Sequence, residues 1–392
     1  MTTRIARSIA DVEAAAWNAL PGAESPFLRH EFLLALEQSG CATPATGWDA
    51  HHVLHHGADG RLRAAMPLYL KPHSWGEFVF DFAWADAYQR AGLRYYPRLV
   101  SAVPFTPATA PRLLAASDAA RMVLLEAARE EMRRLGASSL HVLFPAHRDR
   151  EFLVEAGLLP RLDCQFHWHN EDYSGFEDFL AGFTAEKRKK VRRERRRVAE
   201  AGIECRTLQG ADLDDAMIDT VYRLHAMTFA RYGHAPYLNR EFFGRLAAAL
   251  PDALVIELAT RHGEPIACAV SLRGRDALYG RYWGASGDYH SLHFELCYHR
   301  GIEYCIRERL ARFEPGTQGE HKLLRGFAPT PVWSAHDIAD ARFGEAIAAW
   351  LDRERQERRS WLREAVSHLP FRRAEIPARL EDDVRNCLAA ED

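Results

Sequence analysis

Residues 253–273 read ALVIELATRHGEPIACAVSLR, and this stretch decides the fold class. Two runs rich in Val, Ile, Leu and Ala flank the dipeptide His262-Gly263, where the chain must turn. Apolar runs of strand length on either side of a short Gly-containing turn are typical of an antiparallel hairpin. The stretch therefore predicts two paired strands.

The residues around this hairpin continue the pattern with further strands and helices. We expect a strand at 277–286, a long helix over 292–310, and then at 312–322 a strand that runs into a Gly-bearing loop. Two more helices are expected before the hairpin, at 212–232 and 239–250. Helices that alternate with strands in this way pack on a sheet, so the predicted fold class is α/β with a mixed sheet (α+β).

The first half of the chain has a similar order of elements. A hairpin is predicted around Asp59-Gly60 from strands at 51–56 and 62–71, after a helix at 26–39. Further strands are predicted at 76–82, 95–105, 138–144 and 164–170, and helices at 83–92, 117–135 and 148–157. This repetition predicts a duplicated α/β unit, with halves at 1–170 and 171–336 and a helical tail at 337–392.

Length and composition indicate a soluble globular protein. The chain has 392 residues, 47% of them hydrophobic and 27% charged, which is too long for one ordinary core. The N-terminus lacks the apolar core of a signal peptide, and no window of 18 apolar residues predicts a membrane span. The seven cysteines form no C-x-x-C pair, so we expect free thiols in the reducing cytoplasm.

Three segments together resemble a known family, the bacterial FemAB-like predicted N-acyltransferases. The segments are YYPRLVSAVPFTPATAPRLL at 95–114, FTAEKRKKVRRERRRVAEAGI at 183–203, and 279–336, which begins YGRYWGAS. The resemblance implies two GNAT-type halves in tandem and an N-acyl or aminoacyl transfer to an amine. Relatives in this group attach amino acids to peptidoglycan precursors from aminoacyl-tRNA, whereas other GNAT enzymes use acyl-CoA. A cell-wall precursor is therefore one expected acceptor.

One motif of acetyl-CoA-dependent GNAT proteins is not matched. Those proteins carry a [QR]-x-x-G-x-[GA] loop, whose backbone N–H groups hold a pyrophosphate at a helix start. The nearest candidate here runs from Arg281 through Gly284 to Ser286, within a predicted strand. The donor therefore stays open between acyl-CoA and aminoacyl-tRNA, and no tightly bound cofactor is expected.

Polar residues gather after two strands of the second half. Tyr282, Asp288, His290, His293 and Glu295 surround the end of the strand at 277–286, and Glu320, His321, Lys322 and Arg325 follow the next strand. Acyl transfer needs a base, an oxyanion stabiliser and a proton donor, and strand ends in α/β sheets commonly form the ligand crevice. We therefore predict catalytic roles among Tyr282, His293, Glu295, Glu320 and His321, and anion binding by Lys322 and Arg325. The alternative is that Glu295 pairs with His299 on a helix surface.

A proline-rich loop in the first half is a second candidate for substrate binding. Prolines at 104, 107 and 111 restrict its backbone, Thr106 offers a hydroxyl, and Arg112 can hold a carboxylate or phosphate. The alternative is a structural connection that packs the two halves.

Two histidine-rich stretches, HHVLHH at 51–56 and FHWHN at 166–170, alternate as strands do. No other residues complete a metal-ligand spacing, so half-buried strands are predicted and no metal site.

The basic block Glu186–Arg197, EKRKKVRRERRR, has nine basic and two acidic residues, a net +7 in a chain of −3. We expect a helix over 184–201, capped by Thr184, with a thin apolar stripe of Phe183, Val191 and Val198. Ser174 and Glu177 predict a capping box for the preceding short helix.

Three interpretations of the block remain open from the sequence. As an interdomain helix of an enzyme it would attract an anionic substrate through Arg192, Arg193 and Arg196, and tRNA is one such partner. The alternative function is polyanion binding by a degenerate acyltransferase fold. Without the block, the other residues carry a net charge of about −10, since −3 minus +7 is −10. A net negative charge of this size disfavours general nucleic-acid binding. A solvated helix without a ligand is the third. The sequence leaves the oligomeric state open.

Overall fold

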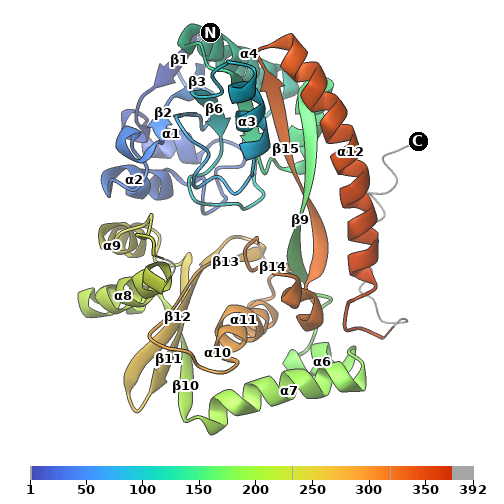
Figure 1. Ribbon diagram of the computed structural model, residues 1–392. Helices are drawn as coiled ribbons and strands as arrows, with labels where there is room; N and C mark the ends of the chain where they lie inside the picture. The colour runs from blue at the N-terminus through green and yellow to red at the C-terminus, as the bar shows by residue number, and fades with distance from the viewer. Residues whose placement is uncertain (1, 232, 318, 373–392) are drawn as a thin grey trace. The chain divides into compact units, whose positions relative to one another are not determined.

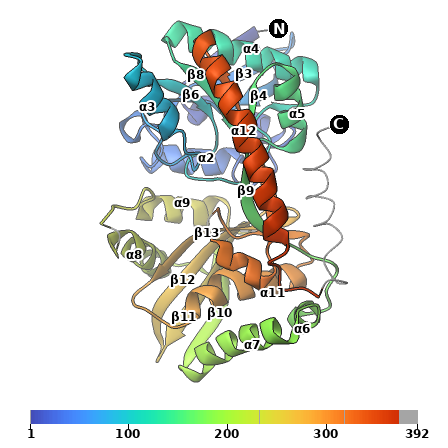
Figure 2. The same ribbon diagram turned by 45° about the vertical axis from the view of Figure 1, so that its right-hand side comes forward.

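The computed structural model describes residues 2–231, 233–317 and 319–372 (Figures 1 and 2). They divide into two compact units. The first contains the residues up to Asp163 together with Val332–Arg358, and the second contains Cys164–Pro331 and the residues from Arg359 onward. The chain passes between the units within β9 (Leu159–His169), β15 (Ala328–Ile338) and α12 (Ala341–Val366). Helix α12, which lies in the tail predicted at 337–392, is thus shared between the units, and residues 373–392 of that tail lie outside the described ranges.

The first unit contains two sheets. In one the strand order is β15–β8–β6–β5–β2, and in the other it is β1–β3–β4–β7. The strands are β1 (Thr2–Ala6), β2 (Asp49–Ala50), β3 (His52–His56), β4 (Leu62–Met66), β5 (Tyr69–Lys71), β6 (Arg98–Ser101), β7 (Leu114–Ala115) and β8 (Ser139–Leu143). The helices are α1 (Ala14–Asn18), α2 (His30–Gln38), α3 (Phe82–Arg90), α4 (Asp118–Leu135) and α5 (His147–Glu155), with 3-10 turns at Ile9–Asp11 and Pro44–Thr46.

The long helix predicted at 117–135 is confirmed as α4. Ser117 accepts a hydrogen bond from the backbone N–H of Ala120, and Gly136 ends the helix with a φ of 60°. Leu124, Leu125 and Ala128 are fully buried in a core that also contains residues of β3, β6 and β8. An N-cap serine and a left-handed glycine are the expected boundary residues.

The strand predicted at 76–82 is wrong. Residues 72–81 form an irregular loop in which Gly76 and Phe78 have φ values of 82° and 62°, and Phe82 already belongs to α3. Positive φ values are incompatible with a strand. The apolar run had suggested a buried strand, yet Glu77 and Asp81 are the side chains that turn inward.

The second unit has the sheet order β10–β11–β12–β13–β14–β9. Its other strands are β10 (Ile203–Gln209), β11 (Leu254–Arg261), β12 (Glu264–Arg273), β13 (Ala277–Ala285) and β14 (Arg312–Glu314). Its helices are α6 (Phe176–Ala181), α7 (Ala185–Glu200), α8 (Asp215–Arg231), α9 (Arg240–Ala249), α10 (Leu292–Phe294), the π-helix η4 (Glu295–His299) and α11 (Arg300–Arg307), with 3-10 turns at Gly210–Asp212 and Glu320–Arg325. Helices α8 and α9 lie on one side of β11–β13, and α10 and α11 on the other (Figure 1).

The hairpin predicted at 253–273 is confirmed, with Arg261 opposite Glu264 and two residues in the turn. His262 and Gly263 have φ values of 53° and 81°, the left-handed pair that a tight hairpin turn requires. None of the helices in the described ranges is both long enough and apolar enough to cross a membrane.

Candidate active site

Strands β13 and β14 separate in the middle of the second unit. They pair in parallel only from Ala277–Arg312 to Tyr279–Glu314, while β13 continues to Ala285. A β-bulge against β12 adds one extra residue, Arg281, to β13 between Gly280 and Tyr282. Bulges change the direction of side chains and often lie beside functional sites.

A cavity of about 80 Å³ lies at this opening and is called the second-unit pocket below. Its lining comes from β12, β13, the helix after β13 and the end of β14: Ala269, Val270, Ser271, Gly280, Arg281, Tyr282, Trp283, His293, Cys297, Tyr298 and Pro315. Of the residues that the sequence analysis proposed as catalytic, Tyr282 and His293 line this cavity.

The helix after β13 presents different residues to two sides because it contains a π-helical turn. Leu292–Phe294 is α-helical, Glu295–His299 is π-helical, and α11 continues from Arg300. His293, Cys297 and Tyr298 line the pocket. Short π-helical insertions occur frequently at functional sites, because they shift one side chain out of the regular register.

Tyr298 and His293 belong to the pocket lining, and His321 contacts both of them from the 3-10 turn after β14. The Tyr298 hydroxyl lies 2.8 Å from His321 Nε2, a hydrogen bond, and the rings of His293 and Tyr298 meet edge to face at 5.3 Å. Burial, with the nearby charges of His321, Lys322 and Arg325, lowers the pKa of His293 to about 4. Burial and the same two cations lower the pKa of His321 as well. Both imidazoles are therefore neutral at pH 7 and able to accept a proton.

Lys322 and Arg325 lie on the 3-10 turn that carries His321. Lys322 is 2% exposed, its Nζ donates to the Gly316 carbonyl at 2.6 Å, and burial lowers its pKa to about 7. Arg325 is buried over the Phe294 ring and donates to Glu194 Oε1 at 2.7 Å. The structure thus brings His293, His321, Lys322, Arg325 and Tyr282 together within one unit.

The two predicted glutamates lie elsewhere. Glu295 is buried on the opposite side of the helix, where it accepts from Arg195 Nη2 at 2.9 Å, and Glu320 is exposed. The alternative surface pair of Glu295 with His299 is wrong, because both are buried and His299 Nε2 lies 3.5 Å from Glu194. Catalytic roles for Glu295 and Glu320 stay predictions, and the contacts of Glu295 favour a structural role.

In the first unit, Thr106 and Arg112 are buried and bound to backbone carbonyls. Thr106 Oγ1 donates to Pro104, while Arg112 Nε donates to Leu143 at 2.8 Å and Nη2 to Ala108 at 2.9 Å. This loop fills the space beyond the parallel strands β6 and β8, the counterparts of β13 and β14. Substrate binding by the two residues stays a prediction, and their contacts favour the structural connection.

The basic block forms α7 within the second unit, and the apolar stripe of Phe183, Val191 and Val198 is buried as predicted. Glu194 also belongs to the buried side, and Arg195 binds Glu295 and Glu303. Two capping details are wrong: Thr184 makes no side-chain cap, and the cap of α6 is Gly175, with Ser174 donating to Asp178.

The other face of α7 is exposed and cationic, with Lys189, Arg192, Arg193, Arg196 and Arg197 in contact with solvent. Arg192 pairs with Glu177 and Arg196 with Glu200, whereas no ion pair is recorded for Lys189 or Arg193 within the described ranges. Substrate binding by Arg192, Arg193 and Arg196 stays a prediction.

The histidine-rich stretches form strands, β3 and the end of β9. His51 Nδ1 lies 2.6 Å from Glu131 Oε1, and His52 contacts Glu37. Across the described residues, no group of three or more His, Cys, Asp or Glu side chains could hold a metal ion. Six cysteines are free thiols there, and Cys387 lies outside the described ranges.

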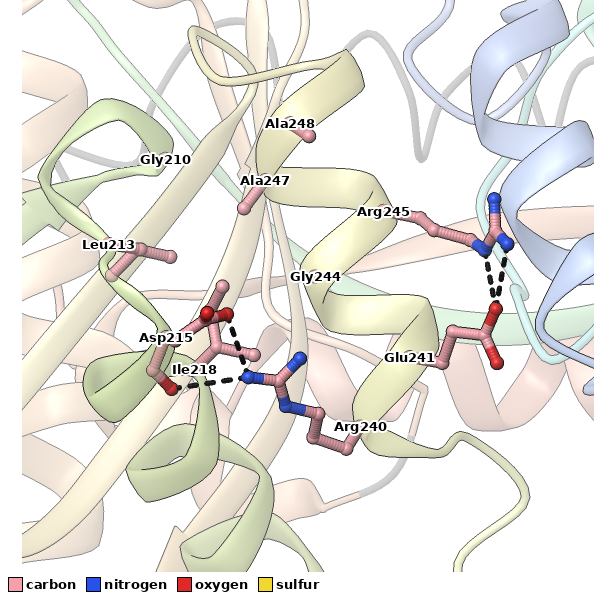
Figure 3. Close-up of a pocket in the computed structure, with 10 residues that line it drawn as sticks. All are labelled: Gly210, Leu213, Asp215, Ile218, Arg240, Glu241, Gly244, Arg245, Ala247 and Ala248. Atoms are coloured by element: carbon pink, nitrogen blue, oxygen red, sulfur yellow. Dashed lines mark hydrogen bonds and ion pairs between the residues drawn. The ribbon is translucent and has the colours of Figure 1, made fainter.

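A larger surface pocket of about 620 Å³ lies between α8 and α9 (Figure 3). Its polar side chains are already paired: Arg240 with Asp215 and Asp219, and Arg245 with Glu241. It therefore offers less unsatisfied chemistry than the second-unit pocket.

The sequence prediction missed Tyr298, Cys297, Glu194 and Arg195. Cys297 and Tyr298 lie within the helix predicted at 292–310, and only the π-helical turn directs them to the pocket. Glu194 looked like one more exposed charge in a basic run. Its position three residues after Val191, on the apolar stripe, was the signal that could have revealed it.

Comparison with known proteins identifies the family. Residues 8–373 match the model of the FemAB-like family, described as peptidoglycan biosynthesis/recognition. None of the curated proteins matches the chain.

Solved structures resemble this chain at low identity. FemX is 11% identical with a TM-score of 0.52, over 89% of this chain and 100% of FemX. The C-terminal domain of a protein provisionally assigned as a lysylphosphatidylglycerol synthetase of Agrobacterium fabrum is 11% identical with a TM-score of 0.53, over 87% and 96%. A tandem GNAT protein from the clavulanic acid biosynthesis pathway is 12% identical with a TM-score of 0.41, over 86% and 98%.

The predicted mixed α/β fold class is confirmed. Because the family model matches nearly the whole of the described chain, this protein belongs to the FemAB-like family.

Proposed function

We propose that this protein transfers an acyl or aminoacyl group to an amine, and that the transfer takes place in the second-unit pocket. The observation that carries the proposal is the hydrogen bond between Tyr298 and His321 beside the opening of β13 and β14. Acyl transfer to an amine needs a group that takes a proton and a group that returns one. A neutral imidazole joined to a phenol supplies both.

The reaction balances with these two groups alone. The acceptor nitrogen attacks the donor carbonyl carbon and forms the C–N bond, while its proton passes to the Tyr298 oxygen and the Tyr298 proton passes to His321 Nε2. The carbonyl oxygen carries the negative charge of the intermediate. When the C–O or C–S bond to the leaving group breaks, the relay runs back and protonates the departing oxygen or sulfur.

Cationic groups beside the relay would stabilise the oxyanion. We assign this role to Lys322, which follows His321 in the chain and is buried with a pKa of about 7, and whose Nζ would have to leave the Gly316 carbonyl to reach the oxyanion. A charge in a site with little water stabilises a developing oxyanion more than it would at the surface. Arg325 is already bound to Glu194, so we assign it to holding α7 and the 3-10 turn together.

The chemistry of the relay limits the class of donor, and the family description suggests an acceptor. An acyl thioester such as acyl-CoA and an aminoacyl ester such as aminoacyl-tRNA are both compatible with the relay, and both carry phosphates. The exposed cations of α7 would attract either donor, most strongly at low salt. A cell-wall precursor with a free amine is the acceptor that the family description favours, in the cytoplasm.

The alternative function, polyanion binding without catalysis, is favoured by one observation, the exposed cationic face of α7. It predicts that the protein binds tRNA or DNA at about 0.1 M salt, and that substitutions in the second-unit pocket leave this affinity unchanged. If the protein binds an acyl donor but binds neither tRNA nor DNA at this salt concentration, the alternative function is excluded.

Amide hydrogen exchange with a panel of donors tests the proposal. The intact protein is incubated with acetyl-CoA, with mixed aminoacyl-tRNA, or with deacylated tRNA as the control. We expect a donor to slow exchange at residues 280–283 and 293–298, the lining of the pocket, beyond the effect of deacylated tRNA. Protection that is confined to α7, or absent with both donors, would contradict the proposal.

A further inference from the structure

Two buried cations lie side by side in the first unit. Lys71 of β5 and Arg98 of β6 are direct partners across the antiparallel pair, and both are 0% exposed. Like charges in directly opposite positions repel each other, and buried charges require counter-charges. Burial lowers the pKa of Lys71 to about 7, and a carboxylate in front of the pair favours its charged form.

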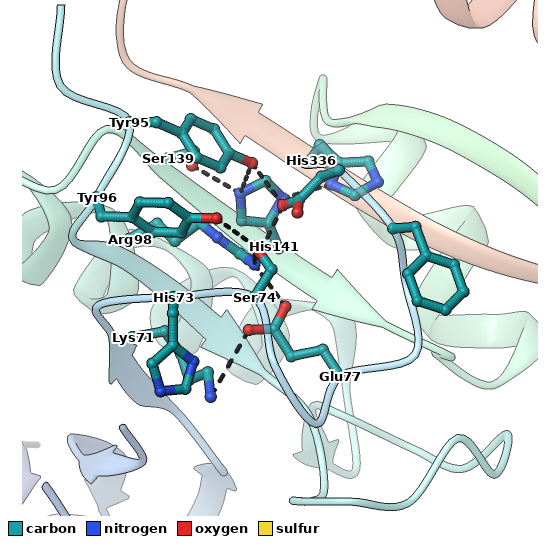
Figure 4. A network of polar contacts seen from close by, with 12 residues as sticks. Lys71, His73, Ser74, Glu77, Tyr95, Tyr96, Arg98, Ser139, His141 and His336 are labelled. Carbon is teal, nitrogen blue, oxygen red and sulfur yellow. Dashed lines mark hydrogen bonds and ion pairs between the residues drawn. The ribbon is translucent and has the colours of Figure 1, made fainter. Parts of the chain in front are cut away.

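The loop 72–81, called the Trp75 loop here, provides such carboxylates in the free protein (Figure 4). Arg98 Nη2 lies 2.6 Å from Glu77 Oε2 and 3.1 Å from Asp81 Oδ2, and Lys71 Nζ lies 3.8 Å from Glu77 Oε1. Arg98 also donates to Ser74 Oγ at 2.7 Å, and Lys71 donates to the Trp75 carbonyl at 3.1 Å. Each contact joins the sheet to the loop.

The match between the two cations and the two carboxylates is incomplete. Glu77 Oε1, Asp81 Oδ1 and Arg98 Nε are buried and make no hydrogen bond within the described residues. Most buried polar atoms in proteins are hydrogen-bonded, so three unsatisfied atoms around one ion cluster are unusual. An anion with several oxygens in tetrahedral arrangement would satisfy the Arg98 fork and Lys71 together.

The Trp75 loop has its apolar and charged residues reversed relative to an ordinary surface loop. Glu77 and Asp81 are each 3% exposed, whereas Trp75 and Phe80 are 69% and 56% exposed, and Phe82, just after the loop, is 42% exposed. The loop's ion pairs with Lys71 and Arg98 are part of what holds it, beside the hydrogen bond from the Phe105 N–H to the Gly76 carbonyl at 3.1 Å and the contact between the Ser74 and Tyr96 hydroxyls at 2.7 Å. A ligand that replaces the two carboxylates removes the ion pairs, the charged part of these contacts.

We propose that Lys71 and Arg98 form a binding site for a phosphate-bearing ligand, and that Glu77 and Asp81 occupy this site until the ligand displaces the Trp75 loop. The ligand must replace two negative charges at once, which a phosphate or diphosphate group does within a few ångströms. The site is separate from the second-unit pocket and does not depend on acyl transfer.

The phosphate could belong to a free diphosphate or to a lipid headgroup. Trp75, Phe80 and Phe82 would contact the chain of a lipid, because their rings lie 6.0 and 6.2 Å apart and form one exposed aromatic cluster. The test therefore has two arms, inorganic diphosphate and a short-chain phosphatidic acid below its micelle concentration. If phosphatidic acid binds more tightly than diphosphate, the ligand is a lipid. If the two bind equally, the site recognises the phosphate alone.

The experiment measures amide hydrogen exchange of residues 74–81 in the intact protein with each ligand. We expect saturating ligand to accelerate exchange in this loop by about tenfold or more, because the loop opens as the ligand binds. The variant Lys71→Met is expected to lose this response. The variant Arg90→Gln/Arg148→Gln, which removes two exposed cations elsewhere in the first unit, is the matched control and is expected to retain it.

A second variant covers the outcome in which Lys71→Met fails to fold. Glu77→Gln/Asp81→Asn keeps the size of the side chains and removes the internal anions, so the loop should exchange faster without ligand. Diphosphate should then raise its melting temperature more than that of the wild type, since binding to the folded state stabilises it. An unresponsive loop in the wild type, or an equal melting shift in the double variant and the wild type, would overturn the proposal.

Discussion

The Tyr298 hydroxyl and His321 Nε2 are 2.8 Å apart, although 23 residues separate them in the sequence. Tyr298 comes from a π-helical turn and His321 from a 3-10 turn after β14. Two irregular turns thus meet beside the place where β13 and β14 separate. This relationship leads to the first two predictions.

Replacing Tyr298 with Phe should lower kcat by about 10²–10³, because it removes the proton relay but keeps the ring. Steady-state transfer rates, with melting temperature as the check on folding, measure the effect. Tyr304→Phe is the matched control, since that hydroxyl contacts Arg273 and is not in the pocket lining. Equal losses in the two variants would indicate a general packing effect and refute the relay.

The rate should fall on the acid side below about pH 6.5. The relay needs neutral His321, whose pKa is lowered from its ordinary value of 6.5 by burial, Arg325 and Lys322. The active form is therefore present above that pKa and is lost as the pH falls through it. The pH profile of kcat/KM checks this, and His321→Gln should abolish the acid limb together with most of the activity. A wild-type profile that falls already above pH 7 on acidification would contradict the assignment.

Stability should also decrease with acid, because of two histidines in the first unit. His141 and His336 are buried, their Nδ1 atoms lie 2.6 Å apart, and burial lowers both pKa values well below 6.5. The unfolded chain binds protons below pH 6.5 that the folded chain does not. The free energy of unfolding should thus be fully present above pH 6.5 and fall by about 1.4 kcal/mol per pH unit per histidine below it.

Urea unfolding between pH 7.5 and 5.0 measures this slope. His336→Asn should flatten it, although other buried histidines such as His225, with its pKa lowered to about 4, contribute too. An identical slope in the variant would show that this pair does not govern the acid sensitivity.

Arg195 should matter for stability more than any other arginine of the basic block. It joins α7 to Glu295 and Glu303, and without it the buried carboxylate of Glu295 is left without its ion pair. Arg195→Gln is expected to cost about 1–3 kcal/mol, and Arg193→Gln, at an exposed position on the same helix, less than about 0.5 kcal/mol. Chemical denaturation measures the free energy of unfolding of both variants. Equal losses in the two variants would contradict this prediction.

The exposed arginines of α7 should affect donor binding and leave the fold intact. Arg192→Gln/Arg193→Gln/Arg196→Gln removes three positive charges, so the Kd of an anionic donor should rise several-fold at low salt and less at 0.3 M. Binding titrations at two salt concentrations, with melting temperature alongside, measure this. If the triple variant instead unfolds, the face is part of the scaffold, and the donor must bind elsewhere.

Most elements of the fold could be predicted from local pattern. The hairpin around His262-Gly263 and the helix between Ser117 and Gly136 carry their own turn and capping residues. Strands β1 and β15 were missed, because their residues alternate weakly and their pairing partners are distant in the sequence. The false strand at 76–82 shows the limit of hydrophobicity as a guide, since the partners of Glu77 and Asp81 lie on other strands.

The candidate site was only half predictable for a similar reason. Polar residues after strand ends pointed to His293, His321 and Lys322, because sheet topology brings such positions together. Tyr298 could not be recognised, since no local pattern in the sequence announces a π-helical turn. Arg112 looked like a ligand-binding residue because nothing in its own segment shows that carbonyls of Leu143 and Ala108 would use its donors.

Transfer to a surrogate amine tests the central claim most directly. The intact protein is mixed with hydroxylamine and either acetyl-CoA or mixed aminoacyl-tRNA, and the hydroxamate product is quantified by mass spectrometry above the uncatalysed rate. With one of these donors we predict catalysed product for the wild type and for Tyr304→Phe, and a loss of about 10²-fold or more for Tyr298→Phe. No catalysed product with either donor, or an unchanged rate in Tyr298→Phe, would contradict acyl transfer in the second-unit pocket.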